Sequence, residues 1–170
     1  MGFKPSSADS CLYIKKKGNT FTFILIYVDD MLIVSQTEEE YNTVYQALQQ
    51  AFTVTAVGDA KHFLGIEIER DGNGFQLNQK QYILKHAGRF GLENAKPSRI
   101  PLDPAYLQQK EENETHLPNN ARYLSLIGGL LYIAVQTRPD IAASVSILAQ
   151  NSSCPTQLDS QEAKRVLTHT

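Results

Sequence analysis

Two strongly apolar runs follow each other near the start of the chain, at residues 21–28 and 31–34. Both are rich in Phe, Ile, Leu, Tyr and Val, which favour strands, and between them lie Asp29 and Asp30. Two such runs joined by a short polar connection predict a β-hairpin with the aspartates at its tip.

A segment with the apolar spacing of a helix follows this hairpin. Thr37 with Glu40 three residues later has the pattern of a capping box, and apolar residues then recur at helical spacing as far as Phe52. Two further extended runs, 63–69 and 75–78, are joined by Asp-Gly-Asn-Gly, whose residues tolerate positive φ. This pattern predicts a second hairpin.

The remainder of the chain is mainly helical in pattern. A short amphipathic helix over 82–90 is stopped by Gly91, and a nearly all-apolar helix covers 123–135. Gly128 and Gly129 lie inside this second helix, where glycine costs about 1 kcal/mol relative to alanine. We interpret the two glycines as permitting a close contact with another helix.

Three further segments complete the prediction. The acidic and polar segment 103–114 predicts a solvated linker. Thr137 and Asp140 form a second capping-box pattern before a helix that continues to Leu148, and a last helix covers 158–167. Hairpins with one packed helix, followed by helices, define an α+β class.

Composition limits the function classes. The chain has 170 residues, 42% apolar and 20% charged, which is typical of one ordinary globular domain or two small lobes. No apolar run reaches the ~18 residues of a membrane span, so we expect no membrane role. The net charge of −2 excludes a protein that is basic on average, so nucleic-acid binding would depend on local charge.

Local charge does vary along the chain. Lys15, Lys16 and Lys17 form a basic run that we place just before the first strand, and residues 80–99 are also basic. Basic clusters are more often solvated faces than binding sites, so this signal is weak by itself.

The aspartate pair is the best candidate for chemistry. Neighbouring side chains inside a strand point to opposite faces, but at a hairpin tip both carboxylates can reach one side. No Lys, Arg or His occurs within 23–34 to neutralise them, and the turn lacks the glycine that tight turns favour. Two such carboxylates suit Mg²⁺, yet so short a motif also fits an acidic structural turn.

Longer segments carry a more specific resemblance. The segments "LIYVDDMLIVS", "KHFLGIEIERDGNGFQLNQKQYI" and "YLSLIGGLLYIAVQTRPDIAASVSILAQ" together resemble the reverse transcriptase of copia-type retrotransposon polyproteins, in order and along essentially the whole chain. The resemblance implies a partial polymerase palm over 1–78, built of β-hairpins with a packed helix. It implies a helical thumb and the start of the connection to ribonuclease H over 79–170.

The same resemblance implies RNA-directed DNA synthesis by two-metal nucleotidyl transfer, with two Mg²⁺ ions or Mn²⁺ in their place. The implied partners are an RNA template, a DNA primer, deoxynucleoside triphosphates, upstream polymerase segments and the downstream ribonuclease H. The implied location is a cytoplasmic virus-like particle, or the nucleus.

Residue roles follow from the matching motifs. Asp29 would bind both metal ions together with an aspartate from an earlier palm strand, and Asp30 would have a lesser role in the acidic cluster. Val28 would lie beside the primer end and the incoming nucleotide, and Tyr27 would support the hairpin from the template-primer side.

A second group of residues would contact nucleic acid. Phe63 and Gly65 match the primer grip, where glycine lets backbone approach phosphate, although a β-bulge glycine explains Gly65 equally well. Lys80, Lys85 and Arg89 would contact phosphates of the primer-template through the thumb.

The fingers and the third catalytic aspartate should precede Met1, so we expect this chain to be a piece of a polyprotein that is inactive in isolation. Two alternatives stay open. The chain could be a non-catalytic nucleic-acid-binding remnant of a retrotransposon polymerase, or a globular interaction domain in which the aspartate pair is only a turn.

Overall fold

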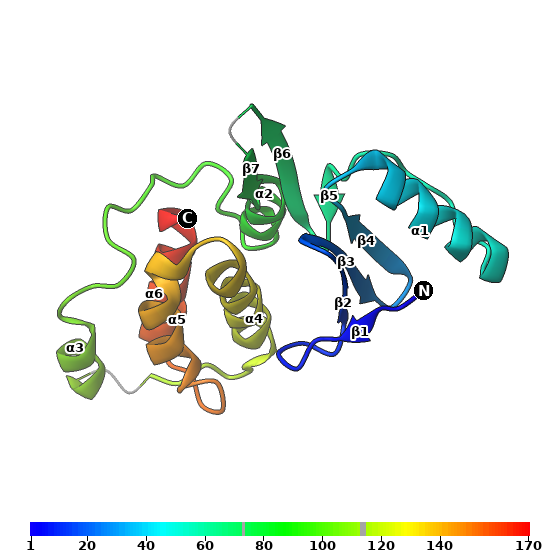
Figure 1. The fold of residues 1–170 in the computed structure, drawn as a ribbon. Coiled ribbons are helices and arrows are strands. Elements are labelled where there is room, and N and C mark those ends of the chain that lie inside the picture. The colour runs from blue at the N-terminus through cyan, green and yellow to red at the C-terminus, as the bar shows by residue number, and fades with distance from the viewer. Residues whose placement is uncertain (73, 113–114) are drawn as a thin grey trace. The chain divides into compact units, whose positions relative to one another are not determined.

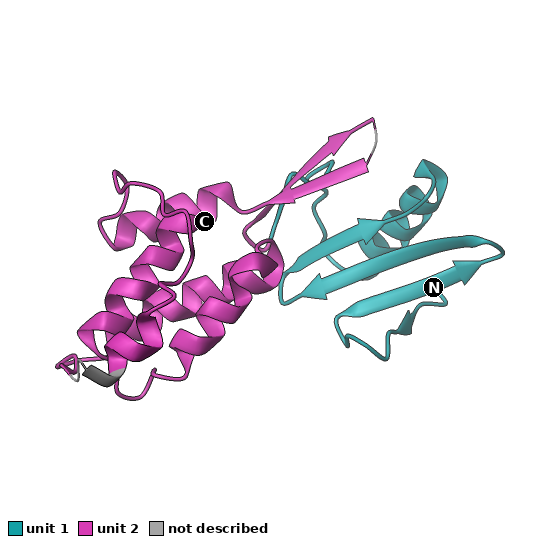
Figure 2. Cartoon of the chain, turned by 90° about the vertical axis from the view of Figure 1, so that its left-hand side faces the viewer, with its two compact units in different colours: residues 1–63 teal, residues 64–170 magenta. Residues whose placement is uncertain are grey.

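The computed structural model describes residues 1–72, 74–112 and 115–170. The chain divides into two compact units, residues 1–63 and 64–170, shown in different colours in Figure 2. Strands pair in antiparallel sheets and helices make up most of the second unit, so the predicted α+β class is confirmed. The functional boundary expected at residue 78 lies inside the second unit.

Unit 1 is a four-stranded antiparallel sheet with one helix on one of its faces (Figure 1). The strands are, in spatial order, β1 (Lys4–Pro5), β2 (Leu12–Lys17), β3 (Thr20–Tyr27) and β4 (Asp30–Val34). Helix α1 (Glu38–Ala51) follows β4, and the two-residue strand β5 (His62–Phe63) ends the unit.

Alternation along β3 builds the small core of this unit. Ile24 faces α1 and is buried with Val44 and Leu48 of the helix. The expectation that Lys15 to Lys17 precede the first strand is wrong, because they belong to β2 and pair with β3. Their long apolar stems can lie along a sheet while the ammonium groups stay in water.

The start of α1 agrees with the predicted cap in part. The Thr37 hydroxyl accepts a hydrogen bond from the Glu40 amide at 3.3 Å, as expected of an N-cap. The Glu40 carboxylate instead accepts from the hydroxyl of buried Thr22 at 2.6 Å. Since a buried hydroxyl needs a partner, this bond ties the helix to the sheet and replaces the second half of the capping box.

Unit 2 begins with a hairpin and continues with helices. Its elements are β6 (Ile66–Asp71), β7 (Gly74–Asn78), α2 (Lys80–Arg89), α3 (Tyr106–Glu112), α4 (Ala121–Gln136), the 3₁₀ helix η1 (Pro139–Ile141), α5 (Ala142–Ala149) and α6 (Gln157–His169). Strands β6 and β7 are antiparallel, so the second predicted hairpin is confirmed; Asn73 in its turn lies outside the described residues.

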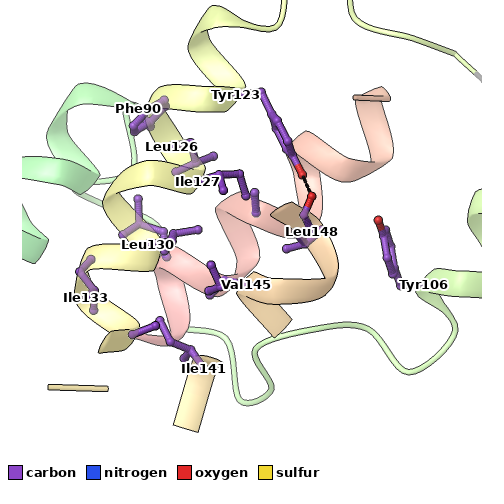
Figure 3. Packing of buried hydrophobic residues seen from close by; sticks show 14 residues of the cluster. Phe90, Tyr106, Tyr123, Leu126, Ile127, Leu130, Ile133, Ile141, Val145 and Leu148 are labelled. Carbon is purple, nitrogen blue, oxygen red and sulfur yellow. Dashed lines mark hydrogen bonds between the residues drawn. The ribbon is translucent and has the colours of Figure 1, made fainter. Parts of the chain in front are cut away.

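Helix α4 is the centre of the unit 2 core (Figure 3). It contacts α2, η1, α5 and α6, which together cover its apolar side. Its fully buried residues include Leu130 and Ile133, and they pack with Ile141, Val145 and Leu148 from the following turns. Among the described residues, no helix is long and apolar enough to cross a membrane.

The two glycines of α4 have different surroundings. A Cβ atom at Gly129 would lie 2.1 Å from Cε1 of His86 on α2, so the two atoms would overlap. Around Gly128, a Cβ atom would meet nothing within 4 Å. The predicted close helix contact is therefore confirmed for Gly129 alone, where the ring of His86 packs against the backbone of α4.

The capping box predicted at residues 137–140 is wrong. The Thr137 hydroxyl donates to the side chain of Gln79 at 2.7 Å, and the Asp140 carboxylate pairs with Arg138 at 2.7 Å. Because both side chains have these partners, neither caps the following turn. A complete capping box occurs instead at the start of α6, between Thr156 and Asp159.

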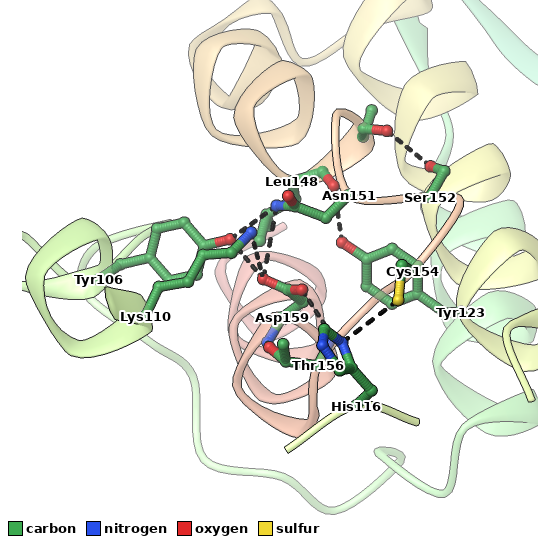
Figure 4. A network of polar contacts seen from close by, with 11 residues as sticks. Tyr106, Lys110, His116, Tyr123, Leu148, Asn151, Ser152, Cys154, Thr156 and Asp159 are labelled. Atoms are coloured by element: carbon green, nitrogen blue, oxygen red, sulfur yellow. Dashed lines mark hydrogen bonds and ion pairs between the residues drawn. The ribbon is translucent and has the colours of Figure 1, made fainter. Parts of the chain in front are cut away.

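The predicted solvated linker is also wrong in its first part. Tyr106 at the start of α3 is only 1% exposed, and its hydroxyl donates to the buried Asp159 carboxylate at 2.5 Å (Figure 4). Burial and this bond raise the pKa of Tyr106. Lys110 approaches the same carboxylate at 3.4 Å, so the network holds α3 against α6. Residues 113–114 lie outside the described part of the chain.

We predict that His86 makes the stability of unit 2 depend on pH. Burial lowers the pKa of His86 from 6.5, with Arg89 lowering it further against an opposing bond to the Leu126 carbonyl. The unfolded chain therefore binds more protons below pH 6.5, and stability should fall as the pH drops below this value. The slope should be at most about 1.4 kcal/mol per pH unit, the limit for one proton.

Urea unfolding followed by circular dichroism at pH 7.5 and 5.0 tests this dependence. His86→Leu should show a smaller difference in unfolding free energy between the two pH values than the wild type. His62→Leu, at an exposed position, should keep the wild-type difference. An unchanged pH dependence in His86→Leu would contradict the assignment.

Candidate active site

The hairpin of β3 and β4 carries the aspartate pair at its tip. Tyr27 pairs with Asp30, so Val28 and Asp29 form a turn of two residues. The prediction that both aspartates lie at a hairpin tip is thereby confirmed. The continuous register from Tyr27–Asp30 to Phe23–Val34 fixes where the turn falls.

The backbone of this turn is strained at Val28. Its φ is +52°, whereas Asp29 is not among the residues with positive φ. Turns with positive φ only at the first central residue favour glycine there, and a β-branched residue in the left-handed region is an outlier. Such conformations cost about 1–3 kcal/mol and cluster at functional sites. The Val28 side chain is 83% exposed, so packing does not explain its conformation.

Strand alternation places Asp30 on a defined face of the sheet. Along β4, Asp30 shares its face with Leu32 and Val34, whereas Ile33 faces the core beneath α1. Asp30 is therefore on the face opposite the helix. Tyr27, directly across from Asp30, is 53% exposed on that same face.

Both carboxylates are exposed and have no hydrogen bond or ion pair within the described part of the chain. Adjacent unpaired carboxylates are the oxygen donors that Mg²⁺ prefers. The same described residues contain no cluster of three or more His, Cys, Asp or Glu side chains suited to a metal. The pair thus fits a divalent metal as part of a ligand set that needs further donors.

The remaining predicted residues lie elsewhere in the fold. Phe63 is half-buried in β5, and Gly65 is exposed, with a φ of +78°, in the turn before β6. Leu64, its neighbour, also has a positive φ of +51°. Two consecutive left-handed residues are the geometry of a tight turn, so this favours a turn glycine over a bulge at Gly65.

Two tyrosines hold this turn, and the sequence analysis did not assign them a site role. The Tyr132 hydroxyl on α4 donates a hydrogen bond to the carbonyl of Leu64. A Cβ atom at Gly65 would lie 3.5 Å from that hydroxyl and 3.8 Å from Tyr82 of α2. Tyr82 and Tyr132 are aromatic residues in two predicted helices, which marked them as packing positions. Helical periodicity could not predict that both would contact the turn at Leu64 and Gly65.

The basic residues of α2 do not form a single face. Lys80, Lys85 and Arg89 are all exposed. At about 100° per residue, Lys85 and Arg89 are separated by about 40° around the helix, whereas Lys80 is about 140° from Lys85. Lys85 and Arg89 can therefore approach one surface together, and Lys80 faces another direction.

Comparison with known proteins identifies the family. The family described as reverse transcriptase (RNA-dependent DNA polymerase) matches residues 1–104. The chain belongs to this family, whose members are polymerase-type enzymes. More particularly, it is a reverse transcriptase-like domain of the copia-type retrotransposon Pol polyproteins, so the resemblance seen in the sequence is confirmed.

The relatives are mostly far longer than this chain. The retrovirus-related Pol polyprotein from transposon RE1 of Arabidopsis thaliana is 34% identical over 98% of the chain and 11% of its own length. The Pol polyprotein from transposon TNT 1-94 of Nicotiana tabacum is 34% identical over 84% of the chain and 11% of its own length. A transposon Ty5-1 protein of Saccharomyces cerevisiae is 30% identical, with 54% of its length covered. No solved structure matches the chain.

We predict that Val28→Gly stabilises unit 1 by about 1 kcal/mol. Glycine adopts the left-handed region freely, which removes a cost of about 1–2 kcal/mol and adds a smaller entropic cost. Urea unfolding measures the change. Val28→Ile, which keeps the branched side chain, should differ from the wild type by less than about 0.5 kcal/mol. Destabilisation by glycine would mean that the turn is not strained in this way.

Proposed function

We propose that the chain is the catalytic-hairpin and thumb segment of an RNA-directed DNA polymerase from a copia-type retrotransposon polyprotein. The observation that carries the proposal is the unpaired carboxylate pair at the strained tip of the β3–β4 hairpin, in a member of the reverse transcriptase family. Residues 1–78 would be the second half of the palm. Residues 79–170 would be the thumb and the start of the connection to ribonuclease H.

Each residue at the hairpin has a distinct task in this proposal. Asp29 and Asp30 would hold divalent cations, Mg²⁺ or Mn²⁺, together with a third carboxylate from another segment. When bound, such cations activate a hydroxyl group and neutralise phosphate charge. Val28, exposed at the turn, would lie beside the primer end and the incoming nucleotide. Tyr27 would support the hairpin from the template-primer side, on the face that it shares with Asp30.

The nucleic-acid contacts would come from the last residue of unit 1 and from the turn and helix α2 at the start of unit 2. Phe63 and the exposed, left-handed Gly65 would approach the primer backbone. Lys85 and Arg89, on one side of α2, would contact phosphates, and Lys80 would contribute from a different direction. Such contacts read the backbone and not the sequence.

A second candidate function has one observation in its favour. Lys85 and Arg89 are exposed and lie about 40° apart around α2, so both can approach one nucleic-acid backbone. A non-catalytic remnant would retain only this binding of primer-template. Activity and binding assays on the same chain separate the two candidates.

We predict that the isolated chain has no measurable RNA-directed DNA synthesis. Two adjacent carboxylates hold two cations poorly, because a two-metal site fixes its ions about 3.5–4 Å apart with several shared ligands. Primer extension on poly(A)/oligo(dT) with Mg²⁺ or Mn²⁺ measures this. Template-dependent incorporation that Asp29→Asn abolishes would show that this chain is a complete enzyme. An extended chain with the preceding polymerase segments should be active, and lose that activity in Asp29→Asn.

We predict weak, salt-dependent binding of a primer-template duplex through α2. Two phosphate contacts give a slope of log affinity against log salt of about −1.8, and a third from Lys80 would bring it to about −2.7. The net charge of −2 opposes association, so we expect micromolar or weaker affinity at physiological salt.

Fluorescence anisotropy across a salt series provides the measurement. Lys85→Glu/Arg89→Glu should reduce both affinity and slope, whereas Lys96→Glu/Arg99→Glu, an equal change of charge at exposed positions outside α2, serves as the control. Equal losses in the control would indicate a general charge effect. Salt-independent binding would remove the binding remnant as a candidate.

A further inference from the structure

Two aromatic side chains from different helices contact the turn before β6. Tyr132 on α4 donates its hydroxyl hydrogen bond to the Leu64 carbonyl, and Tyr82 on α2 lies beside Gly65. The two rings meet edge to face, with centroids 4.9 Å apart and an interplanar angle of 64°. This arrangement is favourable for aromatic pairs, so the two tyrosines form one support for the turn.

The turn has a conformation that needs such a support. Leu64 has a φ of +51°, and the left-handed region is unfavourable for a residue other than glycine. The bond from Tyr132 satisfies the carbonyl of this same residue, so it acts directly on the strained peptide. Gly65 beside it is exposed and remains accessible to a ligand.

The support continues into the helix interface. Tyr82 stacks on His86 with ring centroids 5.9 Å apart, and His86 meets Phe90 edge to face at 5.1 Å. Nε2 of His86 is 3.2 Å from the Leu126 carbonyl of α4. A row of aromatic rings along α2 therefore connects the turn to the site where His86 packs against the backbone of α4.

We infer that Tyr132 is a positioning residue that sets the Leu64–Gly65 turn for its contact with the primer backbone. The inference rests on the proposed function for the primer contact. The hydrogen bond from Tyr132 to the Leu64 carbonyl, in contrast, lies within unit 2 and is independent of that function. Tyr132 touches neither primer nor metal in this role; it acts through the carbonyl of Leu64.

Tyr132→Phe removes the hydroxyl and keeps the ring against Tyr82. A matched control exists on the same helix, because the Tyr123 hydroxyl also donates to a backbone carbonyl, that of Leu148, at 2.7 Å in the core. Tyr123→Phe deletes the same kind of bond at a position that does not contact the turn. Each variant is assayed as the full chain at a temperature where both are folded.

Two measurements are made on each variant. Backbone chemical shifts and couplings of Leu64 and Gly65 report φ, and fluorescence anisotropy reports affinity for an RNA–DNA primer-template. Tyr132→Phe should lose the left-handed signature of Leu64 and bind about five-fold more weakly, the size expected for one hydrogen bond. Tyr123→Phe should change stability only.

The alternative outcomes are distinct. Unchanged φ at Leu64 in Tyr132→Phe, or equal loss of affinity in both variants, would overturn the positioning role. A wild-type chain that binds no duplex would refute the proposed function and the primer role with it. In that case, a change of φ confined to Tyr132→Phe would still show that Tyr132 fixes the turn.

Discussion

Close packing of the His86 ring on the backbone at Gly129 is the constraint on which unit 2 depends. Any side chain at residue 129 would overlap the ring, so glycine alone lets α2 approach α4 this closely. The approach brings Tyr82 into contact with Tyr132, and together they reach the Leu64–Gly65 turn. The close contact at Gly129 is thus linked, through Tyr82 and Tyr132, to a turn about 65 residues earlier in the chain.

The candidate site in unit 1 differs in this respect, because Asp29 and Asp30 are exposed and no core packs around them. The β3–β4 register leaves only two residues for the connection between Tyr27 and Asp30. A connection this short favours a turn with positive φ at its first central residue, which Val28 adopts. The strain persists because the ladder on either side of the turn fixes it. The same ladder holds Asp29 and Asp30 on a rigid support, which the proposed metal-binding role would need.

The fold was predictable wherever one local pattern decided the structure. The hairpin tip at Asp29 followed from two apolar runs, and the cap at Thr37 followed from its hydroxyl and the helical spacing behind it. Prediction failed where a distant side chain competed for the same atoms. The Thr22 hydroxyl donates to the carboxylate of Glu40, and the side chain of Gln79 accepts from the hydroxyl of Thr137. Neither partner can be predicted from the local sequence.

The same limit explains the missed elements. The lysines of β2 were not predicted to lie in a strand, because strand prediction depends on alternating apolar residues. These lysines pair with β3 through their backbone groups, which the sequence pattern does not show. Tyr106 lies in an acidic segment, and it joins the core because the fold brings it against buried residues such as Asp159, 53 residues later. Residues proposed to act by their own chemistry, such as Asp29, are visible in a motif. Tyr132, whose proposed role depends on its hydrogen bond to the carbonyl of Leu64, becomes visible only when the fold brings the two segments together.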